Sequence, residues 1–90
     1  MSEVDRTVTI RNRLGLHARP AGEFVKAASK FESKITVKKG ELEVNGKSIM
    51  AVMTLAAECG SKVTVRAEGA DAEAAVEAVA EVLDREFGDI

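Results

Sequence analysis

The sequence predicts an α+β fold, an open-faced two-layer sandwich in which helices pack on one face of a four-stranded antiparallel sheet. Two observations support this prediction. Four segments alternate apolar and polar residues, so each would form a strand with one buried face and one wet face. Segments with helical spacing of apolar residues follow these strands in the order β-α-β-β-α-β-α. Ninety residues suffice for one hydrophobic core, so we expect a single domain over 1–90.

Turn and capping residues mark where the elements begin and end. Asn45 and Gly46 form a turn signal, and Gly60 is expected to end the second helix as a C-terminal glycine does. Asp71 is the expected N-cap of the third helix, and Gly88 its expected stop. The predicted strands cover 6–11, 33–40, 41–44 and 61–69, and helical spacing of apolar residues extends over 21–31, 47–57 and 71–87.

Composition and charge exclude several classes of function. The formal net charge is −2, and the chain has three Phe but no Trp or Tyr, which argues against a nucleic-acid-binding protein. No apolar run approaches the roughly 20 residues that span a bilayer, and the N-terminus lacks the apolar core of a signal peptide. The single cysteine, Cys59, has no disulfide partner and no metal-ligand spacing around it. We therefore expect a cytoplasmic protein without a metal.

The only histidine and the only proline lie three residues apart, as His17 and Pro20. Proline is tolerated only in the first turn of a helix, so His17 is expected at or just before the helix start. The backbone N–H groups of Ala18 and Arg19 then lack helical partners and face whatever is bound at His17. The positive helix end favours a neutral, nucleophilic ring and an anion built onto it, and Arg19 adds a positive charge. This arrangement suits acceptance of a phosphoryl group, although a surface histidine that only caps the helix is the alternative.

The segment 47–57 contains a second candidate site. Ser48 is an N-cap candidate for the second helix. Ile49, Met50 and Met53 are more large apolar side chains than one buried face of so short a helix needs. They either all belong to the core or form an exposed patch that docks partners.

The stretch "GLHARPAGEFVKAA", followed about thirty residues on by "GKSIMAVMTLAA", resembles the HPr phosphocarriers of the bacterial phosphoenolpyruvate-dependent sugar phosphotransferase system. The resemblance covers essentially the whole chain and implies the strand order 1-4-2-3. It implies that His17 takes a phosphoryl group on its pros nitrogen from enzyme I and passes it to enzyme II A domains. Arg19 matches the family's active-site arginine. The resemblance further implies a monomeric carrier that needs no cofactor and does not turn over substrate by itself.

The resemblance also assigns roles beyond the histidine. It implies partner docking through Gly22, Ile49, Met50 and Met53, and regulatory phosphorylation of Ser48 by a serine-directed HPr kinase/phosphorylase. Two departures, "RLG" at 13–15 and Gly22 where alanine or serine is common, leave the partners open. A regulatory or nitrogen-related phosphorelay is therefore the alternative. A binding module switched only at Ser48 would not need His17, and a histidine-dependent hydrolase would need a second catalytic group near it.

Overall fold

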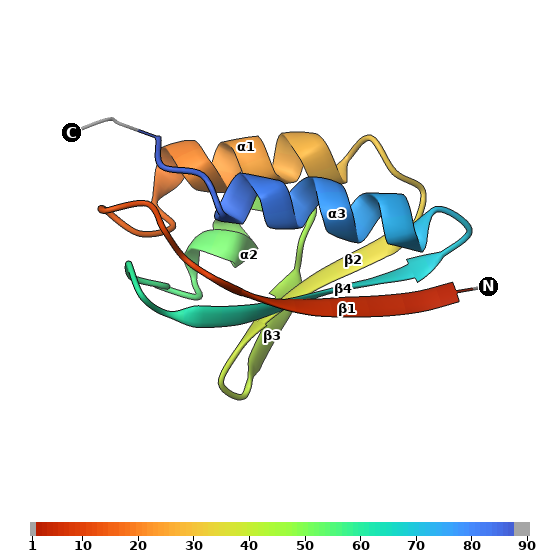
Figure 1. Cartoon of the computed structure of the whole chain (residues 1–90), viewed down its shortest axis with the longest axis horizontal. Helices are drawn as coiled ribbons and strands as arrows, with labels where there is room; N and C mark the ends of the chain where they lie inside the picture. Colours follow the sequence, from red (N-terminus) through yellow and green to blue (C-terminus); the bar gives the residue numbers. More distant parts are fainter. Residues whose placement is uncertain (1, 88–90) are drawn as a thin grey trace.

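A four-stranded antiparallel sheet forms one layer of the structure, and the helices form the other (Figure 1). The structure is a computed structural model that describes residues 2–87. Its strands are β1 (Ser2–Thr9), β2 (Lys34–Lys39), β3 (Leu42–Asn45) and β4 (Lys62–Gly69), and its helices are α1 (Ala18–Ala28), α2 (Ile49–Met53) and α3 (Ala72–Leu83). The strand order is β1-β4-β2-β3, with the helices on one face. The predicted fold class, element order and strand order are confirmed.

Side-chain alternation determines which face of the sheet meets the helices. In β4, Val63, Val65 and Ala67 are buried, while the residues between them are exposed or half-buried. Because β4 lies between β1 and β2, its apolar residues have cross-strand neighbours on both sides: Val65 lies opposite Val37 of β2, and Ala67 lies opposite Val4 of β1. Such pairs on one face stabilise the sheet and fix its register.

Helices α1 and α3 each pack one row of apolar side chains against this face of the sheet. Phe24 of α1 is fully buried between Ala21 and Ala28, and α3 contributes Val76 and Val79 to the same core. Burying a side chain the size of phenylalanine stabilises a fold by about 1.5–3 kcal/mol. The two helices lie side by side (Figure 1), so the start of α1 is adjacent to the chain that leaves α3.

The helix ends differ from the predictions. α3 ends at Leu83 and α2 at Met53, each four residues earlier than expected, and α1 ends at Ala28, before the expected Phe31. Gly60 does not end α2, so that prediction is wrong. Its N–H donates to the carbonyl oxygen of Ile10 at 2.9 Å, and its φ of 93° serves the turn before β4. Gly88, the expected stop of the third helix, lies outside the described residues.

Asp71 is the N-cap residue of α3, but its side chain does not cap the helix. The carboxylate instead accepts hydrogen bonds from the Ser33 hydroxyl and from the N–H groups of Glu32 and Ser33, at 2.9 and 3.0 Å for the two backbone donors. These bonds stabilise the charged form and lower the pKa of Asp71, the Ser33 hydroxyl contributing most. Asp71 therefore ties the start of α3 to the turn before β2, which explains why the expected capping bond is absent.

Candidate functional site

His17 is the N-cap residue of α1, as the sequence predicted. Its backbone is extended (φ −87°, ψ −163°), and its carbonyl oxygen accepts the first helical hydrogen bond, from the N–H of Ala21 at 2.9 Å. The imidazole makes no capping hydrogen bond to the helix, so its contribution to the helix start is made by the backbone alone. Its Nε2 atom is buried. The ring is thus held with one nitrogen turned into the protein.

A tight loop determines where His17 lies. Gly15 has a φ of +78°, and a Cβ atom there would lie 2.6 Å from the carbonyl oxygen of Ala57, closer than real Cβ contacts come. The same carbonyl accepts a hydrogen bond from the N–H of Leu16 at 2.8 Å. Glycine at position 15 therefore allows the loop to pack directly on the chain between α2 and β4, and Leu16, which is buried, anchors the residue before His17.

The first turn of α1 offers backbone donors beside His17. Ala18 and Arg19 are exposed, and their N–H groups precede the helical hydrogen-bond ladder. Pro20 is buried in the same turn, where it adds no N–H and fixes the backbone. A helix start of this kind favours a negatively charged group near His17.

The Arg19 side chain lies over an aromatic ring. The guanidinium carbon of Arg19 is 5.7 Å from the centroid of the Phe87 ring, and that of Arg85 is 5.3 Å from the same centroid. The third helix was predicted to extend to Phe87, but Phe87 lies beyond α3, which ends at Leu83. The sequence did not reveal this contact, because the helical spacing of Phe87 already explained the residue as part of the third helix.

Asn12 is a second residue that sequence reasoning missed. It is one of two buried polar residues in the described chain, with 3% of its surface exposed. Its side-chain N–H donates to the carbonyl oxygen of Gly15 at 2.9 Å, and its side-chain oxygen accepts from the N–H of Phe87 at 2.9 Å. The only sequence signal was an asparagine three residues before a glycine, which is typical of any turn. Asn12 joins the loop before His17 to the chain after α3.

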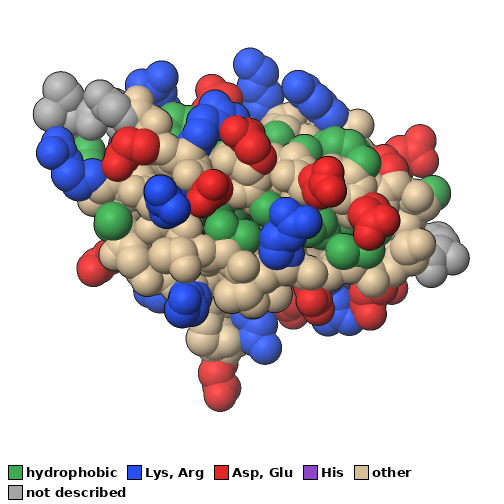
Figure 2. All heavy atoms as spheres, viewed as in Figure 1, with side chains coloured by type: hydrophobic (Ala, Val, Ile, Leu, Met, Phe, Trp, Pro, Cys, Tyr) green, Lys and Arg blue, Asp and Glu red, His purple; other side chains and the backbone are tan. Residues whose placement is uncertain are grey.

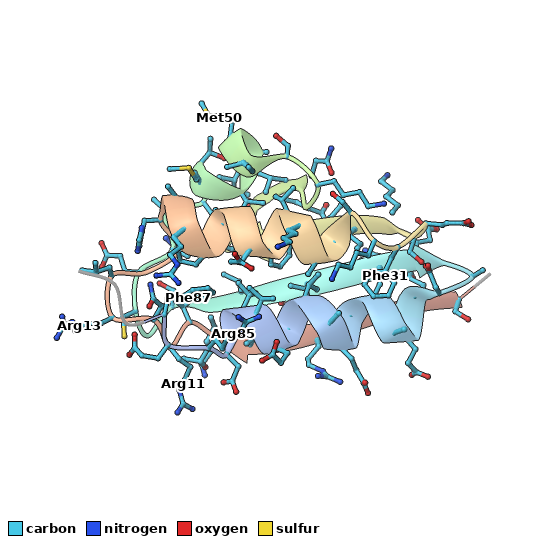
Figure 3. The ribbon with its side chains drawn as sticks, turned by 90° about the horizontal axis from the view of Figure 1, so that it is seen from above. Arg11, Arg13, Phe31, Met50, Arg85 and Phe87 are labelled. Carbon is cyan, nitrogen blue, oxygen red and sulfur yellow. The ribbon has the colours of Figure 1, made fainter. Side chains whose placement is uncertain are left out.

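The segment α2 presents the apolar side chains singled out in the sequence. Ile49, Met50 and Met53, here called the α2 patch, are 44%, 75% and 37% exposed, whereas Val52 is buried. Figure 3 shows Met50 pointing away from the body of the molecule. The alternative that all three belong to the core is therefore wrong. Ser48 is the N-cap of α2, and its hydroxyl accepts from the N–H of Ala51 at 3.2 Å, as predicted.

The fold brings most of these residues onto neighbouring elements. His17, Ala18 and Arg19 share the start of α1, and α2, with Ser48 and the α2 patch, packs against α1 (Figure 3). Gly22 lies half-buried in α1, and apart from the adjacent residues and the helix's own nearby backbone, no heavy atom lies within 4 Å of where its Cβ would be. Gly22 is thus open on the side where a side chain would project.

Neither a metal site nor a membrane-spanning helix occurs within residues 2–87. No three side chains of the His, Cys, Asp and Glu types group there so that they could hold a metal ion, and no helix is long and apolar enough to cross a bilayer. Cys59 is exposed, with Sγ 3.8 Å from the carbonyl oxygen of Arg11. Positive and negative side chains are interspersed over the face shown in Figure 2.

Known proteins resemble this chain over almost its whole length. The family model described as "PTS HPr component phosphorylation site" matches residues 4–85. A phosphocarrier protein HPr of Treponema pallidum (strain Nichols) is 46% identical over 84 residues, which cover 93% of this chain and 96% of that protein. The crystal structure of a phosphocarrier protein HPr from Bacillus anthracis str. Ames has a TM-score of 0.87 and 42% identity, covering 92% of this chain and 99% of that one.

Differently named carriers are also similar. A phosphocarrier protein NPr of Shewanella violacea is 37% identical over 97% of this chain and 96% of its own length. An HPr-like protein Crh of Halalkalibacterium halodurans is 41% identical over 92% of this chain and 99% of its own length. The family model spans most of the chain, the relatives exceed a third identity, and the fold matches a solved HPr structure; the chain therefore belongs to the HPr family of phosphotransferase-system phosphocarriers.

Proposed function

We propose that this chain accepts a phosphoryl group from phosphorylated enzyme I on Nδ1, the pros nitrogen, of His17 and passes it to enzyme II A domains for sugar uptake. The observation that carries the proposal is the position of His17 at the N-cap of α1, in a chain of the phosphocarrier family. The protein acts as a cytoplasmic, monomeric carrier and not as an enzyme, and the reaction needs no cofactor of its own.

The geometry around His17 supports transfer at Nδ1. Nε2 is buried, and the family's chemistry uses the other ring nitrogen, Nδ1. Its lone pair forms the N–P bond while the bond from phosphorus to the donor breaks, and the reverse exchange releases the group to the acceptor. The added negative charge then lies near the N–H groups of Ala18 and Arg19, where a helix start stabilises an anion by about 0.3–1 kcal/mol. The Arg19 guanidinium can donate further hydrogen bonds to the phosphoryl oxygens.

Docking and regulation are assigned to α2 and its neighbour α1. The α2 patch supplies exposed, flexible apolar side chains that adapt to several partner surfaces, and Gly22 leaves room for a partner on α1. Ser48 precedes Ile49 directly. Its phosphorylation by a serine-directed HPr kinase/phosphorylase would add about −1.5 to −2 charges at the edge of this patch. That charge would oppose docking of enzyme I.

A second candidate function is a regulatory or nitrogen-related phosphorelay without sugar transport. Similarity to NPr and Crh proteins favours it, since these names belong to chains nearly as similar as the HPr relatives. Both candidates share phosphorylation of His17 and differ in the acceptor. Transfer from the phosphorylated protein to purified enzyme II A domains of sugar type, compared with those of nitrogen type, separates them.

The test of His17 uses phosphoenolpyruvate, enzyme I and the purified protein, with acid-labile phosphate on the protein as the readout. The wild type should become phosphorylated. His17→Ala and His17→Gln should not, because neither has a nucleophilic ring nitrogen, and both should keep the far-ultraviolet circular dichroism of the wild type. Acid-labile phosphate on either variant would show that another residue is the acceptor.

A further inference from the structure

The ring of Phe87 provides the contact that holds Arg19. Within residues 2–87, Arg19 forms no ion pair, and its guanidinium carbon lies 5.7 Å from the ring centroid. In Figure 1 the chain after α3 passes beside the start of α1, which brings these two residues together from opposite ends of the sequence. An exposed arginine would otherwise sample many rotamers in solvent.

The position of Phe87 is fixed by the loop that carries His17. The N–H of Phe87 donates to the Asn12 side chain at 2.9 Å, and the N–H of Arg13 donates to the Glu86 carboxylate at 2.9 Å. Asn12 also bonds to Gly15 within the same loop. The ring, the loop and the start of α1 therefore form one connected unit.

Two arginine side chains, those of Arg19 and Arg85, lie over the Phe87 ring, but they differ in their other contacts. Arg85 lies 5.3 Å from the ring centroid and also donates to the carboxylate of Glu81 at 3.2 Å. The charge of Arg85 is thus partly neutralised, whereas the ring is the partner that the structure shows for Arg19. Stacking on an aromatic face engages the plane of a guanidinium and leaves its N–H edge available to an anion.

We infer that Phe87 is a positioning residue for phosphoryl transfer: its ring keeps the Arg19 guanidinium at the His17 end of α1, with the N–H edge ready for phosphoryl oxygens. This inference rests on the proposed function of His17. Phe87 does not touch the reacting atoms and acts only through Arg19. Removing the ring should therefore slow transfer only while Arg19 is present.

The test compares Phe87→Leu in two backgrounds, wild type and Arg19→Ala, by the rate of phosphoryl transfer from enzyme I. Phe31→Leu is the matched control, because Phe31 is also half-buried against the core but lies at the other end of the molecule (Figure 3). Phe87→Leu should slow transfer about two- to fivefold in the wild-type background, the size expected for an exposed cation–π contact. It should have no effect in the Arg19→Ala background, and Phe31→Leu should have none in the wild type.

A second measurement does not depend on phosphorylation. The Nε–H resonance of Arg19, assigned by its loss in Arg19→Ala, should carry the ring-current shift of Phe87 and lose it in Phe87→Leu but not in Phe31→Leu. Equal slowing in both backgrounds, faster transfer in Phe87→Leu, or an unchanged Arg19 resonance would each overturn the inference. Failure of the wild type to accept phosphoryl groups would instead overturn the proposed function, and the resonance would still decide whether Phe87 holds Arg19.

Discussion

The side-chain oxygen of Asn12 accepts a hydrogen bond from the backbone N–H of Phe87 at 2.9 Å, although 75 positions separate the two residues in the chain. The other end of the same amide donates to the carbonyl oxygen of Gly15. One buried side chain thus satisfies a donor after α3 and an acceptor before α1. Buried polar groups left without such partners are costly, so this amide stabilises both segments at once.

Asn12→Ala should lower the free energy of unfolding by about 1–3 kcal/mol, since the Phe87 N–H and the Gly15 carbonyl both lose their partner. Asn45→Ala is the matched control. Asn45 is exposed, and its side chain accepts one hydrogen bond, from the N–H of Lys47 at 2.9 Å. The control should lose less than about 1 kcal/mol. Urea unfolding of both variants measures the difference, and equal losses would mean that the burial of Asn12 contributes nothing.

Arg19→Ala should slow phosphoryl transfer about tenfold or more, because a hydrogen bond to a charged group contributes about 1.5–3 kcal/mol and about 1.4 kcal/mol is a factor of ten in rate. Its stability should fall by at most about 1 kcal/mol, the contribution of an exposed cation–π contact. Arg6→Ala removes an exposed arginine from β1 and should leave both quantities unchanged. Transfer kinetics and thermal unfolding test the pair; normal transfer in Arg19→Ala would make Arg19 a bystander.

The sheet and the helix start could be predicted because their signals are local. Alternation in β4 and the proline three residues after His17 each fix a structure within a few positions. The exposed α2 patch could be foreseen only as one of two alternatives. A helix as short as α2 buries little, so hydrophobicity alone does not say which side chains face the core.

The helix ends and the Arg19 contact could not be predicted, because residues distant in the sequence determine them. α3 stops before Phe87, whose N–H bonds to Asn12 and not to a helical carbonyl. Asp71 has a good capping side chain, yet Glu32 and Ser33 occupy its carboxylate. In each case a local preference is overridden by a tertiary hydrogen bond, which leaves no periodic signal in the sequence.

Stability should depend on pH through Asp71. Its pKa is lowered in the folded state, so its contribution is fully present above the unfolded value of about 3.9 and is lost as pH falls through the folded value. The free energy of unfolding of the wild type should therefore fall more steeply below about pH 4 than that of Asp71→Asn, which cannot titrate. Ser33→Ala removes the largest cause of the shift and should lie between the two. Parallel pH profiles for wild type and Asp71→Asn would contradict this assignment.

The pair Ser48→Ala and Ser48→Asp separates the structural role of this residue from its regulatory one. The Ser48 hydroxyl accepts a hydrogen bond from the N–H of Ala51, so Ser48→Ala should lose about 1 kcal/mol of capping energy while docking normally. Ser48→Asp keeps a capping oxygen and adds a negative charge at a helix start, which is worth about 0.3–1 kcal/mol in longer helices. Because α2 has only five residues, the gain should fall at the low end of that range.

The two substitutions should affect the docking of enzyme I in the reverse order to their effects on stability. In Ser48→Asp the new charge adjoins Ile49, which is 44% exposed and begins the α2 patch, so an apolar partner surface would have to approach a carboxylate. Affinity for enzyme I should therefore fall in Ser48→Asp and remain normal in Ser48→Ala. Thermal unfolding and an enzyme I titration on both variants give the comparison. If Ser48→Asp unfolds the protein while Ser48→Ala weakens docking, position 48 is structural, because a regulatory charge must act on the partner surface and leave the helix intact.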